Sequence, residues 1–103
     1  MKSIQGLAKR KGSVVYPRSG KKADDFSPLK AGDIAGVVHV GGGRAYIRFA
    51  SYNGPVQDGT FIGQVVKCEG KIPGVAVGDD VVENMDFVES VVRGDNEAAA
   101  RFR

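Results

Sequence analysis

The sequence predicts an all-β fold, a small antiparallel barrel or sandwich in the size range of SH3-like and OB domains. The chain has 103 residues, which is enough for one small domain. Its 15 glycines are about twice the ordinary share of roughly 7%, a composition that suits short strands and tight turns. Short apolar runs follow one another between turn residues, and the body contains no long stretch of helical period.

These apolar runs place the strands. Each run is bounded by Gly, Pro, Asn or Asp, the residues that favour turns. The boundary Gly41-Gly42-Gly43 predicts a hairpin turn rather than a phosphate-binding loop, because a β run and not a helix follows it. The seven candidate strands are residues 14–16, 34–40, 44–50, 61–68, 71–77, 81–82 and 87–93.

Two of the runs follow a Gly-Asp pair, Gly32-Asp33 and Gly78-Asp79. Glycine accepts the positive φ of a tight turn, and aspartate can accept hydrogen bonds from nearby backbone N–H groups as a strand begins. The pairs therefore support the fold class, and they carry no information about a ligand.

The run 44–50 is the most informative strand, because side chains alternate between the two faces of a strand. One face is apolar and is predicted to belong to the core: Ala45, Ile47 and Phe49. The other face is predicted to be exposed, and it is the candidate surface for nucleic acid or another partner: Arg44, Tyr46 and Arg48.

Charge and pattern divide the chain into a basic extended arm (1–30), a β-barrel body (31–93, with 14–16 as an additional strand) and a tail (94–103). Residues 1–30 carry eight basic and two acidic side chains, whereas residues 31–103 carry seven basic and ten acidic ones. Such an arm either binds nucleic acid or docks on the acidic body of a neighbouring copy or another partner. The residues expected to form the arm interface are Ile4, Leu7, Lys9, Arg10, Lys11 and Tyr16.

The tail is predicted to form a short helix. Asp95 or Asn96 can cap it, and three consecutive alanines favour it. A helix of this length is marginal on its own, so it requires a contact with the body. Phe102 is the residue expected to make that contact.

The sequence offers little catalytic or metal-binding chemistry. Cys68 and His39 are its only cysteine and histidine, too few for the ligands of an ordinary zinc site or for an activated nucleophile. We therefore expect no enzyme activity, catalytic residue, metal, cofactor or small-molecule substrate. The sequence shows no signal-peptide or membrane-spanning pattern, so we expect no membrane partner and an intracellular location, or a virion if the protein is viral.

Three segments, residues 30–33, 63–66 and 71–81, together resemble the small β-barrel decoration, or cement, proteins of tailed-phage heads. In those families Gly-Asp turns also precede paired β runs, and the barrel carries an extended arm. The resemblance implies a structural role in a virion, an oligomer at a symmetry axis of the lattice, and no catalysis.

The sequence therefore supports two hypotheses. The first is a non-enzymatic structural or assembly protein, for example a capsid decoration subunit, that forms a homo-oligomer or binds a larger protein scaffold through its arm and barrel. The alternative is a small nucleic-acid-binding β-barrel that uses the basic arm together with Arg44, Tyr46 and Arg48.

Overall fold

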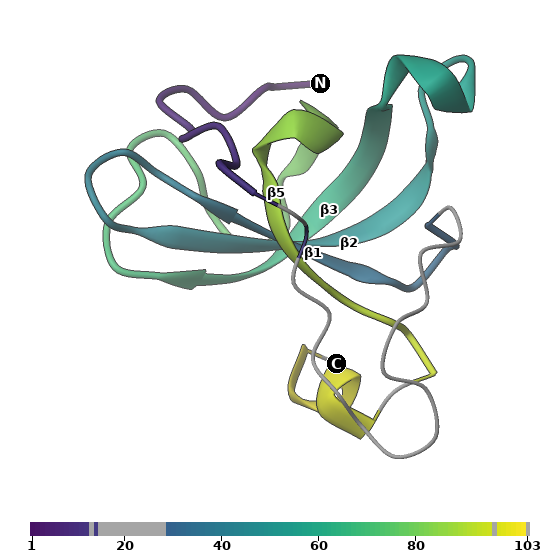
Figure 1. Cartoon of the computed structure of the whole chain (residues 1–103). Helices are drawn as coiled ribbons and strands as arrows, with labels where there is room; N and C mark the ends of the chain where they lie inside the picture. Colours follow the sequence, from purple (N-terminus) through teal and green to yellow (C-terminus); the bar gives the residue numbers. More distant parts are fainter. Residues whose placement is uncertain (13, 15–28, 96, 103) are drawn as a thin grey trace.

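A computed structural model describes residues 1–12, 14, 29–95 and 97–102 and confirms the all-β fold. The described part contains five strands and three short 3-10 helices (Figure 1). The strands are β1 (Ile34–Val38), β2 (Arg44–Tyr52), β3 (Thr60–Glu69), β4 (Asp80–Asn84) and β5 (Val88–Val92). The 3-10 helices are η1 (Val56–Asp58), η2 (Met85–Phe87) and η3 (Glu97–Phe102).

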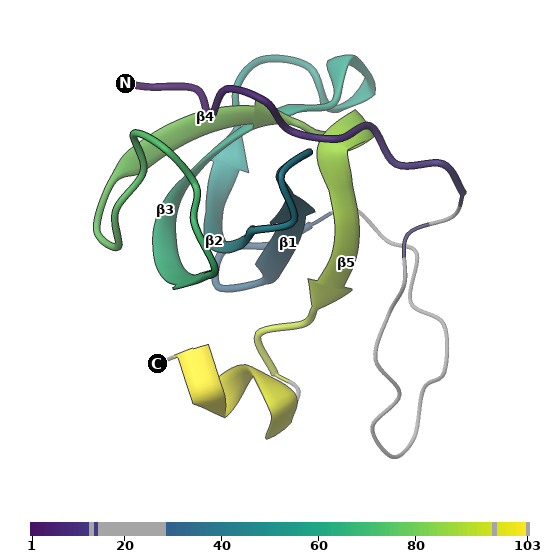
Figure 2. The ribbon, with the colours of Figure 1, turned by 90° about the vertical axis from the view of Figure 1, so that its left-hand side faces the viewer.

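The strands form one antiparallel sheet in the order β4-β3-β2-β1-β5, which curls around a core (Figures 1 and 2). The 3-10 helix η2 lies between the last two strands, β4 and β5. The topology establishes the architecture, but one fold can serve many unrelated functions, so the function must be argued from the surface.

The inner face of the sheet forms the main core, and it includes the predicted face of β2. Ala45, Ile47 and Phe49 are all buried. They pack with apolar side chains from each of the other strands, among them Phe61 of β3 and Val81 of β4. The period-two pattern of this strand therefore correctly identified the side chains that it contributes to the main core.

The predicted strand 71–77 is wrong. In the structure this segment is a loop with two turns between β3 and β4. Pro73 lacks the N–H that a strand ladder needs, and Gly74 and Gly78 adopt positive φ values of 77° and 99°. The predicted strand 14–16 is also absent at Val14, which lies outside any strand, while residues 15 and 16 lie outside the described residues.

Both Gly-Asp pairs act as predicted at the start of a strand. The Asp33 carboxylate accepts a hydrogen bond from the Lys30 backbone N–H at 2.9 Å. The Asp79 carboxylate accepts one from the Ala76 N–H, also at 2.9 Å. In each case the donor lies three residues before the aspartate, so the two turns use the same device.

The first part of the arm lies on the barrel of its own chain (Figure 2). Lys2 pairs with Val81 of β4, and Leu7 pairs with His39 just after β1. Ile4 is buried in the main core, and Leu7 packs against it. This corrects the expectation that Ile4 and Leu7 are anchors for a neighbouring copy, because the side chain of Ile4 is buried within the chain and that of Leu7 is partly buried there.

Polar contacts hold the same segment in place. The buried Glu83 carboxylate accepts hydrogen bonds from the Ile4 N–H at 2.7 Å and from the Ser3 hydroxyl at 3.2 Å. The Arg10 guanidinium donates to the carbonyl oxygens of Met85 and Val88, each at 2.8 Å.

The basic residues of the arm therefore have different surroundings. Arg10 is engaged by its own barrel rather than presented to a neighbour, which corrects the expectation for that residue. Lys9 and Lys11 are exposed, and the expected arm residue Tyr16 lies outside the described residues. An arm interface with another molecule stays a prediction for Lys9 and Lys11.

Candidate functional site

The outer face of the sheet is covered in part by η3, which packs across β1, β2 and β5 (Figures 1 and 2). The sequence named Phe102 as the docking residue, and its ring lies 4.8 Å from the ring of Tyr46, centroid to centroid. Both residues are buried, with 4% of Phe102 and 8% of Tyr46 exposed. They form a second, smaller core with Ile34, Val92 and Ala99.

This packing corrects the predicted exposure of Tyr46. The alternation of β2 does place Tyr46 on the outer face, but the folded tail covers its ring. Gly36 pairs with Tyr46 on one side and with Ser90 of β5 on the other, and a Cβ atom at position 36 would lie only 2.5 Å from the Ser90 hydroxyl oxygen.

Three cations gather around Phe102. The Arg101 guanidinium carbon lies 4.6 Å from the centroid of the Phe102 ring and 5.9 Å from that of Tyr46. The ammonium group of Lys67, on β3, lies 6.0 Å from the Phe102 centroid. Arg48 donates a hydrogen bond from Nη2 to the Phe102 carbonyl oxygen at 3.1 Å.

Arg44 lies exposed on the same face of β2, two and four residues before Tyr46 and Arg48. We call the four residues Arg44, Arg48, Lys67 and Arg101 the basic face. The aromatic rings beneath them attract cations electrostatically, so the packing of Phe102 on Tyr46 helps to hold the charges in place.

Among the described residues, Glu69 is the one carboxylate that pairs with a cation of the basic face. It lies 3.6 Å from the Lys67 ammonium and accepts a hydrogen bond from the Tyr46 hydroxyl at 2.8 Å. That hydrogen bond is the main reason that the pKa of Glu69 is lowered. Burial, followed by the same hydrogen bond, raises the pKa of Tyr46. Glu69 therefore stays ionised and Tyr46 stays neutral near neutral pH.

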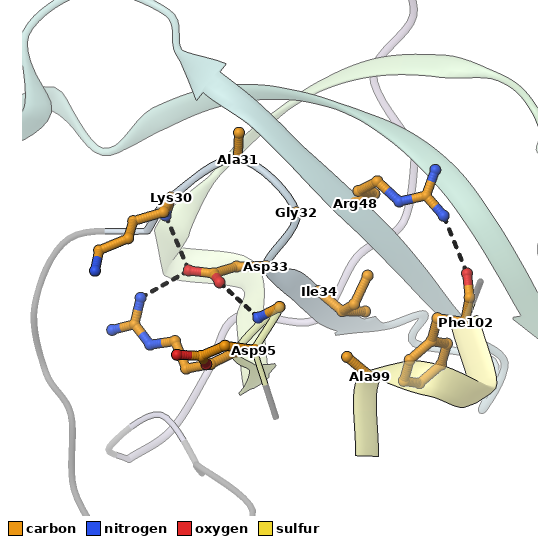
Figure 3. Close-up of a pocket in the computed structure, with 11 residues that line it drawn as sticks. Lys30, Ala31, Gly32, Asp33, Ile34, Arg48, Asp95, Ala99 and Phe102 are labelled. Carbon is orange, nitrogen blue, oxygen red and sulfur yellow. Dashed lines mark hydrogen bonds and ion pairs between the residues drawn. The ribbon is translucent and has the colours of Figure 1, made fainter. Parts of the chain in front are cut away.

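A pocket of about 320 Å³ lies beside η3, between the turn before β1 and the end of β5 (Figure 3). Its apolar lining comes from Ile34, Ala99 and Phe102. Lys30 and Arg48 also line it, but their charged groups lie well apart in the close-up view. Lys30 and Arg48 therefore do not converge on one ligand, and the third cation of the lining, Arg93, forms an ion pair with Asp33.

Asp33 in this pocket is a structural group. Its carboxylate accepts hydrogen bonds from the backbone N–H groups of Lys30 and Gly94 and forms an ion pair with Arg93 at 2.7 Å. The side chains of both ion-pair partners are largely buried. These contacts tie the chain to the barrel at residues 93–94, immediately before the segment that leads to η3.

Known proteins provide no guide to this surface. No protein-family model matches the chain, and no curated protein or solved structure matches it. The resemblance to phage-head decoration proteins therefore stays a prediction.

His39 and Cys68, the other two side chains considered for chemistry, lie in surroundings that do not activate them. The His39 ring accepts a hydrogen bond at Nδ1 from the Gly41 N–H at 2.9 Å. Burial raises the pKa of the Cys68 thiol, which makes its thiolate less available. The described residues contain no cluster of three metal-ligating side chains. Within the same ranges, no helix is long and apolar enough to cross a membrane.

Sequence reasoning found half of the basic face. It named Arg44 and Arg48 from the alternation of β2, but it missed Lys67 and Arg101. Lys67 lies directly opposite Tyr46 in the β2–β3 pairing, so the hairpin register is the signal that would have found it. Arg101 precedes the predicted docking residue, and only the docked position of η3 shows that it belongs to this surface.

Proposed function

We propose that this protein is a non-enzymatic binding module that attaches to the phosphate backbone of nucleic acid through the basic face. The observation that carries the proposal is the separation of charge over the body. The four cations of the basic face are accompanied by Glu69, whereas the rest of residues 31–103 holds nine acidic and three basic side chains. A local positive surface on an otherwise acidic body attracts a polyanion to one place.

The burial of the rings favours recognition of phosphates over recognition of bases. Stacking on a base requires an accessible aromatic face, and the rings of Tyr46 and Phe102 are buried against each other. The side chains left to a ligand are guanidinium and ammonium groups, which bind phosphate oxygens without reading sequence. We therefore expect binding that depends strongly on salt and weakly on sequence.

The test is the affinity of the full chain for a labelled DNA duplex, measured by fluorescence anisotropy at several salt concentrations. If all four cations contact phosphates, the slope of log affinity against log salt is about −3 to −4, because each contact contributes about −0.9. The double variant Arg44→Ala/Lys67→Ala should weaken binding and reduce the slope by about 2.

Lys71→Ala is the control, since it removes one exposed positive charge, in the loop after β3, that is not one of the four cations of the basic face. This variant should bind as the natural chain does. A chain without measurable affinity at low salt, or a Lys71→Ala variant that loses as much as the double variant, contradicts the proposal.

A second candidate function is assembly with other copies or with a larger protein scaffold. It is favoured by the same charge separation, because the basic face of one copy can meet the acidic surface of another. Four exposed apolar side chains, Met1, Val40, Val56 and Val77, add surface for such a contact. The capsid-decoration role implied by the resemblance is the form of this function in which the scaffold is a phage head.

Mass in solution separates the two candidates. Light scattering of the purified chain at low and high salt should show a monomer if nucleic acid is the partner. A salt-sensitive oligomer that Arg44→Ala/Lys67→Ala dissociates, in a chain that does not bind DNA, would favour assembly instead.

A further inference from the structure

We infer that η3 completes the phosphate site only while it is docked on the sheet: Phe102 positions Arg101 there, so that docking of η3 and binding of phosphate stabilise each other. The inference rests on the proposed function and adds to it a coupling between the ligand and one movable element. Phe102 is a positioning residue in this arrangement, because it acts on a ligand through the cations around it.

The basic face is built from two separate parts of the chain. Arg44, Arg48 and Lys67 belong to strands of the barrel, whereas Arg101 belongs to η3. Phe102 joins the two parts, because its ring lies near Lys67 and Arg101 and its carbonyl oxygen accepts a hydrogen bond from Arg48. Without docked η3, the barrel retains three of the four cations.

Docking of η3 also brings like charges together. Arg48, Lys67 and Arg101 all lie around one residue, and Glu69 is the described carboxylate that pairs within this group. Repulsion between the cations opposes docking, and a bound phosphate would remove that repulsion. A phosphate ligand therefore has a higher affinity for the docked state than for the undocked state, which is the condition for coupling.

The remaining attachment of η3 to the barrel is small. It has six residues, and the buried side chains described in it are Ala99 and Phe102. The Asp33 contacts hold the preceding chain at residues 93–94, so η3 can leave the sheet without disturbing β5. A short helix with few buried contacts opens locally at a lower free energy than the core of the barrel.

The experiment is a double-mutant cycle on duplex DNA affinity with Phe102→Ala, Arg101→Ala and the double variant. Each single variant should weaken binding, and each should reduce the salt slope. The double variant should bind within about twofold of the weaker single variant, because Arg101 contributes only when Phe102 holds it. Losses that multiply in the double variant would overturn the inference.

Phe102→Leu tests the positioning role in a second way. Leucine keeps an apolar side chain for docking, so this variant should recover part of the affinity that Phe102→Ala loses. Circular dichroism and thermal unfolding of each variant establish that the barrel is folded, as expected from the separation of the two cores.

Amide hydrogen exchange supplies a readout of docking that does not depend on the cycle. Adding the DNA duplex should slow exchange in residues 97–102 of the natural chain by the factor by which docking strengthens binding. Unchanged or faster exchange would overturn the inference. Faster exchange together with tighter DNA binding by Phe102→Ala would show instead that η3 covers the site and that the ligand displaces it.

Failure of the two proposals gives different results. If the natural chain binds with a steep salt dependence and Arg44→Ala/Lys67→Ala weakens it while Phe102→Ala does not, the coupling is wrong and the proposed function stands. If the natural chain does not bind DNA at low salt, both are wrong.

Discussion

Glu83 of β4 is a carboxylate buried in the barrel. It is 3% exposed, and burial raises its pKa, although the donors Ile4 N–H and Ser3 hydroxyl partly oppose the shift. A raised pKa in the folded state means that the folded chain holds this proton to higher pH than the unfolded chain does. The resulting stability is complete below the unfolded pKa of about 4.3 and is lost as pH rises through the folded value.

Glu83→Gln tests this assignment. Glutamine cannot ionise, and its carbonyl oxygen can still accept the hydrogen bond from the Ile4 N–H. The free energy of unfolding of the natural chain minus that of the variant should therefore fall as pH rises from about 4 toward neutrality. Urea unfolding of both chains across this range measures the difference, in which the opposite contributions of Asp79 and Glu69 cancel. A difference that is constant or rises with pH contradicts the assignment.

Gly63 shows how one residue permits the close pairing of two strands. A Cβ atom at this position would lie 2.5 Å from both the Arg48 carbonyl oxygen and the Ile47 side chain. Gly63→Ala must therefore shift the β2 backbone, and we expect a loss of about 1–3 kcal/mol in the free energy of unfolding. Gly12→Ala is the control, because nothing lies within 4 Å of a Cβ atom there. If urea unfolding gives the two variants the same free energy of unfolding, the β2 backbone can shift without destabilising the fold.

At the scale of elements, the N-terminal segment belongs to the barrel, although its sequence suggested a separate arm. Ile4→Ala should lower the free energy of unfolding by about 2–5 kcal/mol, because it removes a buried side chain from the main core. Gln5→Ala, at the exposed neighbouring position, should change it by less than about 0.5 kcal/mol. Thermal or urea unfolding of the two variants measures both effects. Similar free energies of unfolding for Ile4→Ala and Gln5→Ala would show that the N-terminal segment is not part of the barrel core.

The same segment shows what a sequence pattern can and cannot predict. The fold class, the buried face of β2 and the two Gly-Asp turns were all predictable, because each follows from local periodicity or local turn chemistry. The pairing of Lys2 with Val81 joins residues 79 positions apart, and residues 2–7 carry no alternating pattern that would announce it. Long-range pairings of this kind depend on the assembled barrel rather than on any local preference.

The candidate site also combines features that the local sequence predicts with features that depend on the assembled fold. Alternation placed Arg44, Tyr46 and Arg48 on one face correctly, but it could not show that η3 would cover the middle residue. Lys67 lies opposite Tyr46 in the β2–β3 pairing, whose register shifts between Phe49 and Ser51 and shifts back between Tyr46 and Ile47, so the two irregularities cancel at this pair. The register of the hairpin, and not the alternation of β2 alone, therefore identifies Lys67.

At the scale of the whole molecule, charge and apolar surface are distributed differently. The apolar side chains form two cores on opposite faces of one sheet, and the second core is closed by η3. The cations of the basic face gather over that second core. Of the ten acidic side chains of residues 31–103, Glu69 is the one that pairs with this face among the described residues. The element that completes the outer packing is thus also the element that completes the positive surface.

The pairing of Lys2 with β4 has a consequence for how copies of this protein behave at high concentration. β4 is an outer strand of the sheet, and its free side would otherwise present unpaired N–H and C=O groups. The Lys2 backbone bonds to Asp80 and Val82 on that side, and its side-chain amine forms an ion pair with Asp79. A strand of a second molecule therefore meets an occupied edge and a charged lysine. The first few residues thereby protect the β4 edge of the sheet against pairing with a second molecule.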